Sequence, residues 1–153
     1  MENLNNDEPK IIEGGVSVDD RGEVFFVNGF SFPKIKRFYM VENFSTETIR
    51  AWHGHLEESK YALVVSGSAI IAAVKMDNTT NPNKKNEVHR FVLSERKPSI
   101  LYIPKGYANG FRPLEGKTKI IFFSDSELEK SKNDDYRFPT DYWGMDIWNI
   151  ENR

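Results

Sequence analysis

The chain has 153 residues, 39% of them hydrophobic and 29% charged, a composition that suits one soluble domain with a hydrophobic core. Its formal net charge of -2 provides no global positive field to recruit nucleic acid or an anionic membrane. With no cysteine, the chain has neither a disulfide framework nor thiolate chemistry.

The chain begins with a polar decapeptide, Met1–Lys10, which lacks the apolar segment of a secretory signal peptide. The longest apolar run, Ala69–Val74, is far too short to span a bilayer. We therefore expect a soluble, cytoplasmic protein with no membrane partner and no nucleic-acid partner.

Short runs rich in Val, Ile, Phe and Tyr, separated by Gly, Pro, Asn and Ser, predict strands along most of the chain. In chain order the predicted strands are Glu23–Asn28, Lys34–Asn43, Ile49–His55, Lys60–Val65, Ala69–Met76, Val88–Leu93, Ile100–Ile103, Gly110–Leu114 and Lys117–Phe123. No segment before Asp125 has an apolar period of 3.6 residues, so the pattern is all-β and fits a sandwich or jelly roll. Strands that are apolar on both faces, such as Ala69–Val74, indicate sheets whose outer faces meet a further layer, for example a partner subunit.

The segment after Asp125 has a different character. Asp125 or Ser126 is a suitable N-cap for a short helix that runs through Lys132. Aromatic residues then accumulate at Tyr136, Phe138, Tyr142, Trp143 and Trp148. Such a density of rings predicts that the tail packs onto the body of the protein. We expect one domain over residues 1–153, with its core at about residues 19–125 and a tail of residues 126–153.

Two of the three histidines lie close together, in the sequence Arg50-Ala51-Trp52-His53-Gly54-His55. On a strand, residues i and i+2 project from the same face, so His53 and His55 are expected on one side and Trp52 on the other. Such a pair could bind a metal, or it could transfer protons because imidazole titrates near neutral pH. A pair of solvated strand histidines is the third alternative, and the strand pattern alone leaves all three open.

The histidine pair resembles the first motif of the cupin superfamily, which carries His-x-His, a following Glu and a closing Gly. The similar residues, including those of the second motif Pro-x-Gly-x-x-His, are His53, His55, Glu57 or Glu58, Gly67 and Pro104–Asn109. This resemblance implies an all-β, double-stranded β-helix. The histidine that would complete a cupin metal site is here Asn109, and an amide oxygen is a poor substitute for imidazole on a transition metal. We therefore expect no metal and no other cofactor.

Within the cupins the chain resembles the RmlC-like branch, whose members act on nucleotide-linked 4-keto sugars. Motifs of the dTDP-4-dehydrorhamnose 3,5-epimerases are similar to Asp19–Gly22, Arg50–His53 and Pro104–Phe111. Motifs of the dTDP-sugar 3,4-ketoisomerases are similar to Ile35–Tyr39, Arg50–His55, Ser66–Ser68 and Asp135–Arg137. The similarity extends from about Asp19 to Tyr142.

The departures from each pattern favour the ketoisomerases. In the epimerases the first histidine is a base held by a C-terminal Asp, and a Tyr on a late strand is the acid. His53 occupies the base position, but the Tyr position is predicted to fall at Phe123, whose ring has no proton to donate. No counterpart of the Asp is expected before the chain ends. His55 resembles the ketoisomerases, whereas Lys60 resembles the epimerases.

The resemblance implies that His53 and His55 are catalytic, one of them removing the C3 proton beside the ketone while the other, or Tyr39, moves the hydroxyl proton. The implied substrate-binding residues, several of them suited to a diphosphate, are Arg21, Arg37, Arg50, Lys60 and Asn109. Arg50 belongs with them only if the strand starts, twists or bulges there, because strict alternation places it opposite His53. Candidates for stacking on the nucleotide base are Tyr39, Tyr107 and Phe111.

Relatives of both kinds are dimers in which an N-terminal strand joins the sheet of the partner. The expected partners are therefore a dTDP-linked keto-sugar substrate and a second copy of the chain, with Phe25 and Phe26 in the core or in the dimer contact. Three functions stay open: a 3,4-ketoisomerase, an epimerase acting at C3, C5 or both, and a non-catalytic cupin that only binds a sugar nucleotide.

Overall fold

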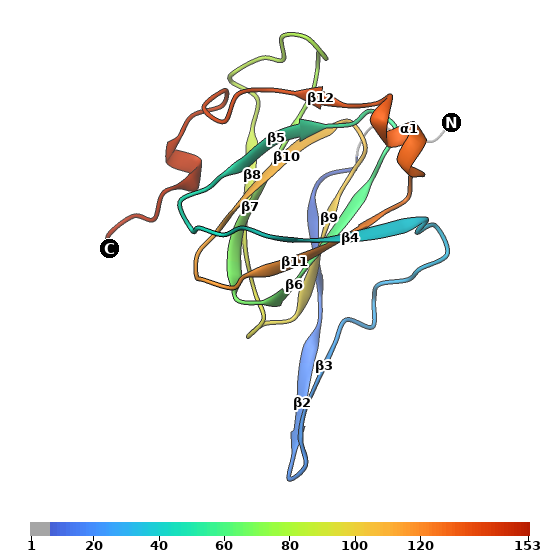
Figure 1. Cartoon of the computed structure of the whole chain (residues 1–153), viewed down its shortest axis with the longest axis vertical. Coiled ribbons are helices and arrows are strands. Elements are labelled where there is room, and N and C mark those ends of the chain that lie inside the picture. The colour runs from blue at the N-terminus through green and yellow to red at the C-terminus, as the bar shows by residue number, and fades with distance from the viewer. Residues whose placement is uncertain (1–6) are drawn as a thin grey trace.

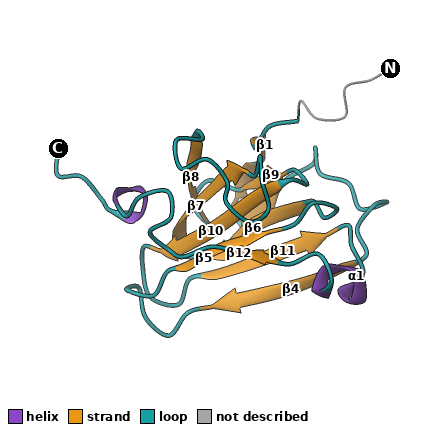
Figure 2. Ribbon diagram, turned by 90° about the horizontal axis from the view of Figure 1, so that it is seen from above, coloured by secondary structure: helices purple, strands orange, loops and turns teal. Residues whose placement is uncertain are grey.

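The computed structural model describes residues 7–153, so the first six residues of the decapeptide Met1–Lys10 lie outside the described part of the chain. Two five-stranded antiparallel sheets stack face to face, and the C-terminal tail folds over one of them (Figures 1 and 2). This double-stranded β-helix confirms the all-β fold class predicted from the sequence. No helix among residues 7–153 is long and apolar enough to cross a bilayer.

The order of the strands brings segments that are distant in sequence side by side. The first sheet runs β1 (Lys10–Glu13), β9 (Ser99–Ile103), β6 (Lys60–Ser66), β11 (Lys119–Ser124) and β4 (Arg37–Glu42). The second sheet runs β12 (Tyr136–Arg137), β5 (Arg50–Gly54), β10 (Tyr107–Pro113), β7 (Ser68–Lys75) and β8 (Val88–Ser94). The remaining elements are the hairpin of β2 (Gly15–Asp19) and β3 (Gly22–Phe26), the helix α1 (Leu128–Lys132) and a 3-10 turn, η1 (Asp146–Trp148).

Every strand predicted from the sequence is present, whereas β1, β2 and β12 were not predicted. These three are only two to five residues long and contain at most two apolar or aromatic residues each, too few to form a recognisable pattern. The helix α1 begins later than predicted, with Glu127 rather than Asp125 or Ser126 at the N-cap position. Asp125 is used elsewhere, because its carboxylate accepts a hydrogen bond from the Ser59 amide at 2.8 Å.

Apolar side chains fill the space between the two sheets. The cluster consists of Ala62, Val64, Ala69, Ile71, Ala73, Leu93, Leu101, Ile103, Tyr107, Phe111, Ile120 and Phe122. At one end, Tyr39 and Val41 of β4 are only partly buried against this core. A cleft opens between the two sheets at that end.

A second apolar cluster covers the outer face of the second sheet. Its members are Trp52, Ile70, Ala72, Val74, Met76, Ala108, Phe138, Trp143, Ile147 and Trp148. The aromatic tail therefore packs onto the body, as predicted. The outer face of Ala69–Val74 meets a further layer, as predicted, and that layer is the tail of the same chain rather than the partner subunit given as an example.

The β2–β3 hairpin projects away from both sheets (Figure 1). Its strands are exposed along their length, and the Phe25 side chain is 54% exposed although it is apolar. Phe25 and Phe26 thus lie outside both core clusters. A two-stranded hairpin without a third strand is only marginally stable in water.

Candidate active site

The cleft lies between β4, β6 and β11 of one sheet and β5 and β10 of the other, and its cavity volume is about 380 Å³. Of the site residues predicted from the sequence, the cleft brings together Arg37, Tyr39, Arg50, His53, His55, Lys60 and Asn109. The tail adds Ser131, Lys132, Asp135 and Arg137 to its wall. The cleft therefore combines titratable, cationic and aromatic side chains from both sheets.

Strand β5 places the two histidines on the cleft side, as its alternation predicts. Asn109 of β10 is the register partner of His53, so its amide lies next to that imidazole. Trp52 points the other way, into the cluster under the tail, where it is almost fully buried. The shared face of His53 and His55 is thus anchored by the packing of the residue between them.

A β-bulge brings Arg50 into the same cleft. On β10, Asn109 and Phe111 are two residues apart, but their partners on β5, His53 and Arg50, are three apart. The extra residue in β5 reverses the alternation, so Arg50 lines the cleft together with His53. Gly110 permits this close approach, since a Cβ there would lie 2.4 Å from the Ala51 Cβ.

His55 is held by acceptors on one side of its ring. Its Nδ1 contacts the carbonyl oxygen of Asp134 and lies 3.3 Å from Oε2 of Glu58. Burial lowers the pKa of His55, the Lys60 ammonium lowers it further, and the Glu58 carboxylate opposes both. His55 is therefore a neutral base near pH 7.

His53 has no hydrogen-bond partner among residues 7–153. Burial, followed by the positive charges of Arg137 and Lys60, lowers the pKa of His53, and the Asp135 carboxylate acts in the opposite direction. Both imidazoles are therefore neutral near pH 7 and able to accept a proton.

A buried carboxylate, Glu58, lies behind His55 and is only 3% exposed. Oε1 accepts hydrogen bonds from Arg37 at 2.8 Å and from the Ser124 hydroxyl, and Oε2 accepts one from Ser131 at 2.9 Å. Burial alone would raise the pKa of Glu58, but the Ser124 hydrogen bond and the Lys60 charge outweigh it, so the pKa is lowered. Glu58 is thus an anion with its acceptor sites occupied.

The cations of the cleft divide into paired and unpaired groups. Arg37 binds Glu58, Lys132 binds Glu129, and Arg137 binds Asp135. Lys60 is only 7% exposed, yet its ammonium makes neither an ion pair nor a hydrogen bond within the described residues. Arg50 likewise has no carboxylate partner there, and its Nε donates to the Asn43 side chain at 2.6 Å. Lys60 and Arg50 are therefore the cations most available to an anionic ligand.

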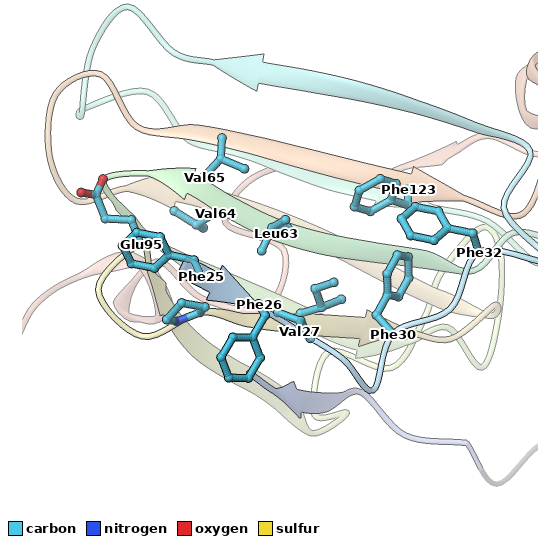
Figure 3. A pocket seen from close by; sticks show the side chains of 12 residues that line it. Phe25, Phe26, Val27, Phe30, Phe32, Leu63, Val64, Val65, Glu95 and Phe123 are labelled. Carbon is cyan, nitrogen blue, oxygen red and sulfur yellow. The ribbon is translucent and has the colours of Figure 1, made fainter. Parts of the chain in front are cut away.

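The phenyl ring that β11 presents to the cleft belongs to Phe122, one residue before Phe123, where the position of the missing acid was predicted. Phe122 faces the cleft and stacks on Tyr39, with ring centroids 5.3 Å apart, whereas Phe123 faces outward toward Phe30 and Phe32 (Figure 3). Side chains alternate along a strand, so a shift of one residue exchanges the two faces. A phenyl ring still occupies the cleft side of β11.

Two further predicted residues lie outside the cleft. Arg21 is at the tip of the β2–β3 hairpin, where it pairs with Asp19 and its side chain is 86% exposed. Tyr107 lies on the inner face of β10 but in the core between the sheets, where it packs against His89 of β8 with ring centroids 6.0 Å apart. Neither residue contributes to the cleft within one chain, so Tyr39 and Phe111 are the stacking candidates that remain.

The tail contributes cleft residues that sequence reasoning did not assign to the site. Strand β12 pairs with β5, which sets Arg137 opposite His53 and brings Asp135 into the cleft wall. Helix α1 supplies Ser131 and Lys132. The similarity of Asp135–Arg137 to a ketoisomerase motif was the one available signal, but it does not indicate where the tail lies.

The residues of the cleft do not fit a cupin metal site. Asn109 stands beside His53 where a third imidazole would be needed, and the acceptor sites of Glu58 are occupied by donors from protein side chains. Within residues 7–153 there is no group of three or more His, Cys, Asp or Glu side chains arranged to hold a metal ion. Two imidazoles and an amide are a weak donor set for a divalent transition metal.

Comparison with known proteins identifies a matching family and a similar protein of Bacillus subtilis. A family model described as dTDP-4-dehydrorhamnose 3,5-epimerase matches residues 7–148. The spore coat polysaccharide biosynthesis protein SpsL of Bacillus subtilis is 31% identical over 107 residues, which cover 69% of this chain and 70% of that protein.

Solved structures share the fold at lower identity. The RmlC epimerase of Mycobacterium tuberculosis superposes with a TM-score of 0.74 at 18% identity, covering 94% of this chain and 76% of that one. A 3,4-ketoisomerase from Helicobacter canadensis superposes with a TM-score of 0.67 at 19% identity, covering 89% of this chain and 95% of that one. The architecture is thus common to both kinds of protein, and the side chains of the cleft must distinguish them.

Proposed function

The chain belongs to the dTDP-4-dehydrorhamnose 3,5-epimerase family, and on that premise we propose that it is a 3,4-ketoisomerase of a dTDP-linked 4-keto-6-deoxy sugar. The resemblance inferred from the motifs is confirmed at the level of the family. The chain is therefore a dTDP-sugar epimerase or isomerase of deoxysugar biosynthesis, and the binding-only alternative is set aside.

One observation carries the proposal: the cleft holds a pair of imidazoles, while strand β11 presents a phenyl ring to it. Phe122 has no proton to donate, so the late-strand acid expected of an epimerase is missing from that position. Two neutral histidines on one face can instead move two protons between adjacent carbon and oxygen atoms. This is the requirement of a ketone transfer from C4 to C3.

The proposed reaction proceeds through an enediol. One histidine removes the proton from C3, the C3–H electron pair forms a C3–C4 double bond, and the C4 oxygen takes up a proton. The C3 hydroxyl then loses its proton, its oxygen forms the new carbonyl, and C4 accepts the proton held by the base. The second histidine, or Tyr39, carries the proton between the two oxygens. Each such group contributes about a hundred- to ten-thousand-fold to the rate.

The cations of the cleft support binding of a nucleoside diphosphate. Lys60 and Arg50 lack carboxylate partners in the described part of the chain, so a diphosphate would supply the missing counter-charge. The Asn109 amide and the aromatic faces of Tyr39 and Phe111 line the same cavity. They suit the hydroxyl groups of a sugar and the flat surface of a base.

An epimerase is the second candidate, and one feature favours it. Tyr39 lies on β4 directly across from Phe122 in the register of β4 and β11, so its phenol is a possible substitute for the missing acid. Its ring also lies near the Lys60 ammonium, at 5.7 Å from the ring centroid. In this case the ketone would remain at C4 while C3 or C5 is inverted.

Incubation with a dTDP-4-keto-6-deoxyhexose in deuterated water, followed by NMR, tests the proposal. Ketoisomerisation moves the carbonyl to C3 and places a proton or deuteron on C4. Retention of the C4 carbonyl with deuterium at C3 or C5 would overturn it in favour of the epimerase. The His53→Asn protein is expected to lose at least about a hundred-fold in turnover.

We also propose that the protein is a homodimer joined through its projecting hairpin. An apolar cavity of about 390 Å³ lies between the hairpin and β6, and Phe25, Phe32 and Phe123 line it (Figure 3). A hairpin that exposes apolar side chains gains stability by pairing with a second copy. Light scattering should give twice the mass of one chain, and Phe25→Asp should give a monomer. Phe44→Asp, at an exposed site outside this cavity, is the control, and a monomeric wild-type protein would contradict the proposal.

A further inference from the structure

We infer that Glu58 is a positioning residue: it holds His55 with Nδ1 as the donor and Nε2 free for substrate, so that His55 is the C3 base. His53 is then the group that moves the hydroxyl proton. The catalytic roles rest on the proposed function, whereas the His55–Glu58 geometry does not depend on it.

The tautomer of His55 follows from the chemistry of its neighbours. A carbonyl oxygen and a carboxylate can only accept hydrogen bonds, and both the Asp134 oxygen and Glu58 Oε2 face Nδ1. Nδ1 must therefore carry the proton, and the lone pair is on Nε2. Within the described residues Nε2 has no hydrogen-bond partner, and His55 lines the cleft. The ring is thus oriented as a general base.

Glu58 is itself too constrained to move away from His55. Arg37 of β4, Ser124 of β11 and Ser131 of α1 all donate to its carboxylate. These donors come from three different elements, so the position of the carboxylate is determined by the assembled fold. A fixed anion beside Nδ1 favours the imidazolium that forms when Nε2 takes a proton.

His53 lacks such support. Asp135 is the nearby carboxylate, but its oxygens bind Arg137, and no hydrogen bond joins it to His53 in residues 7–153. The positive charges of Arg137 and Lys60 act against protonation of His53. Of the two imidazoles, His55 is therefore the one better able to hold the abstracted proton.

Several other titratable groups face His55 and affect its pKa. They are Lys60 of β6, His53 of β5, Glu58 before β6 and Asp134 after α1. Lys60 disfavours the imidazolium, while Glu58 and Asp134 favour it. Loss of the Glu58 charge alone should therefore lower the pKa of His55.

The test compares Glu58→Gln with Glu57→Gln, a matched change at an exposed neighbour whose side chain makes no contact with His55. Glu58→Gln should lower kcat by roughly ten- to a thousand-fold and change KM much less, because the base is misaligned or weakened rather than the binding site removed. Glu58→Asp, which keeps the charge, should recover part of the loss. Glu57→Gln should retain wild-type kcat.

Nitrogen-15 NMR of the imidazoles needs no substrate and separates the inference from the proposed function. Wild-type His55 should show the Nδ1-protonated tautomer, and its pKa should fall in Glu58→Gln but not in Glu57→Gln. The opposite tautomer in the wild type, or an unchanged His55 pKa in a folded Glu58→Gln protein, would overturn the inference. A wild-type protein that turned over no sugar nucleotide, yet showed the expected titrations, would overturn the proposed function alone.

Discussion

Replacing Lys60 with methionine should separate binding from stability. The Lys60 ammonium is nearly buried, has no ion-pair partner in residues 7–153, and lies 5.7 Å from the centroid of the Tyr39 ring. Replacing buried ionic groups with apolar side chains of similar volume is often neutral or stabilises the fold by about 1–4 kcal/mol, while the lost cation–π contact costs about 0.5–2 kcal/mol. The free energy of unfolding should therefore stay the same or rise.

Affinity for dTDP should change in the opposite sense. A hydrogen bond between a charged donor and an anion contributes about 1.5–3 kcal/mol, so Lys60→Met should raise the Kd for dTDP by roughly ten- to 150-fold. The same substitution should raise the pKa of both His53 and His55, because the Lys60 charge lowers both. Nucleotide binding therefore weakens while the fold persists.

Isothermal titration calorimetry with dTDP and urea denaturation measure the two quantities. Lys105→Met removes the same charge from an exposed position and should leave both unchanged. Affinity for dTDP within twofold of the wild type would refute the assignment of Lys60 to the diphosphate. A loss of more than about 2 kcal/mol in stability would refute the description of its ammonium as an uncompensated cation.

Three further predictions concern pH, the bulge and the tail. Because burial lowers the pKa values of His53 and His55 from 6.5, the decline of kcat/KM toward acidic pH should have its midpoint below pH 6.5. A midpoint above pH 6.5 would contradict the lowered pKa values of the two histidines. The same histidines should make the free energy of unfolding fall as the pH is lowered from 6.5 toward their folded-state pKa values. In that range the unfolded chain binds more protons than the folded chain, and urea titrations at several pH values measure the effect. Gly110→Ala should disrupt the bulge in β5 and lower kcat/KM at least tenfold, and crystallography of the variant would show whether Arg50 has left the cleft. Trp148→Ala should cost about 3–5 kcal/mol in urea denaturation, and Trp148→Phe much less, because the buried indole N–H has no hydrogen-bond partner in the described structure.

Features that depend on local order along the chain were predicted well. The two-residue period of a strand was enough to put His53 and His55 on one face and Trp52 on the other. The density of rings after Asp125 was enough to predict a tail that packs onto the body, although it did not identify the outer face of β7 as the target. Each of these features depends on residues within a few positions of one another.

Other features depend on how strands are paired. Arg50 reaches the cleft only through a bulge defined by its partners on β10, and the cleft side of β11 was assigned to Phe123 instead of Phe122 because no local pattern fixes the register. Arg21 resembled a binding residue by motif, yet its hairpin projects away from the cleft of its own chain. Motif spacing carries no information about such placement.

The sequence by itself determined the fold class, the shared face of the two imidazoles and the family of the chain, since periodicity and motif order are properties of contiguous residues. Only the tertiary structure decided which acid supports which histidine. Glu58 meets Arg37, Ser124, Ser131 and His55 because β4, β11, α1 and the end of β5 converge behind the cleft. Hydrogen bonds act over about 3 Å in space, whatever the separation along the chain, so no linear pattern could have predicted that contact.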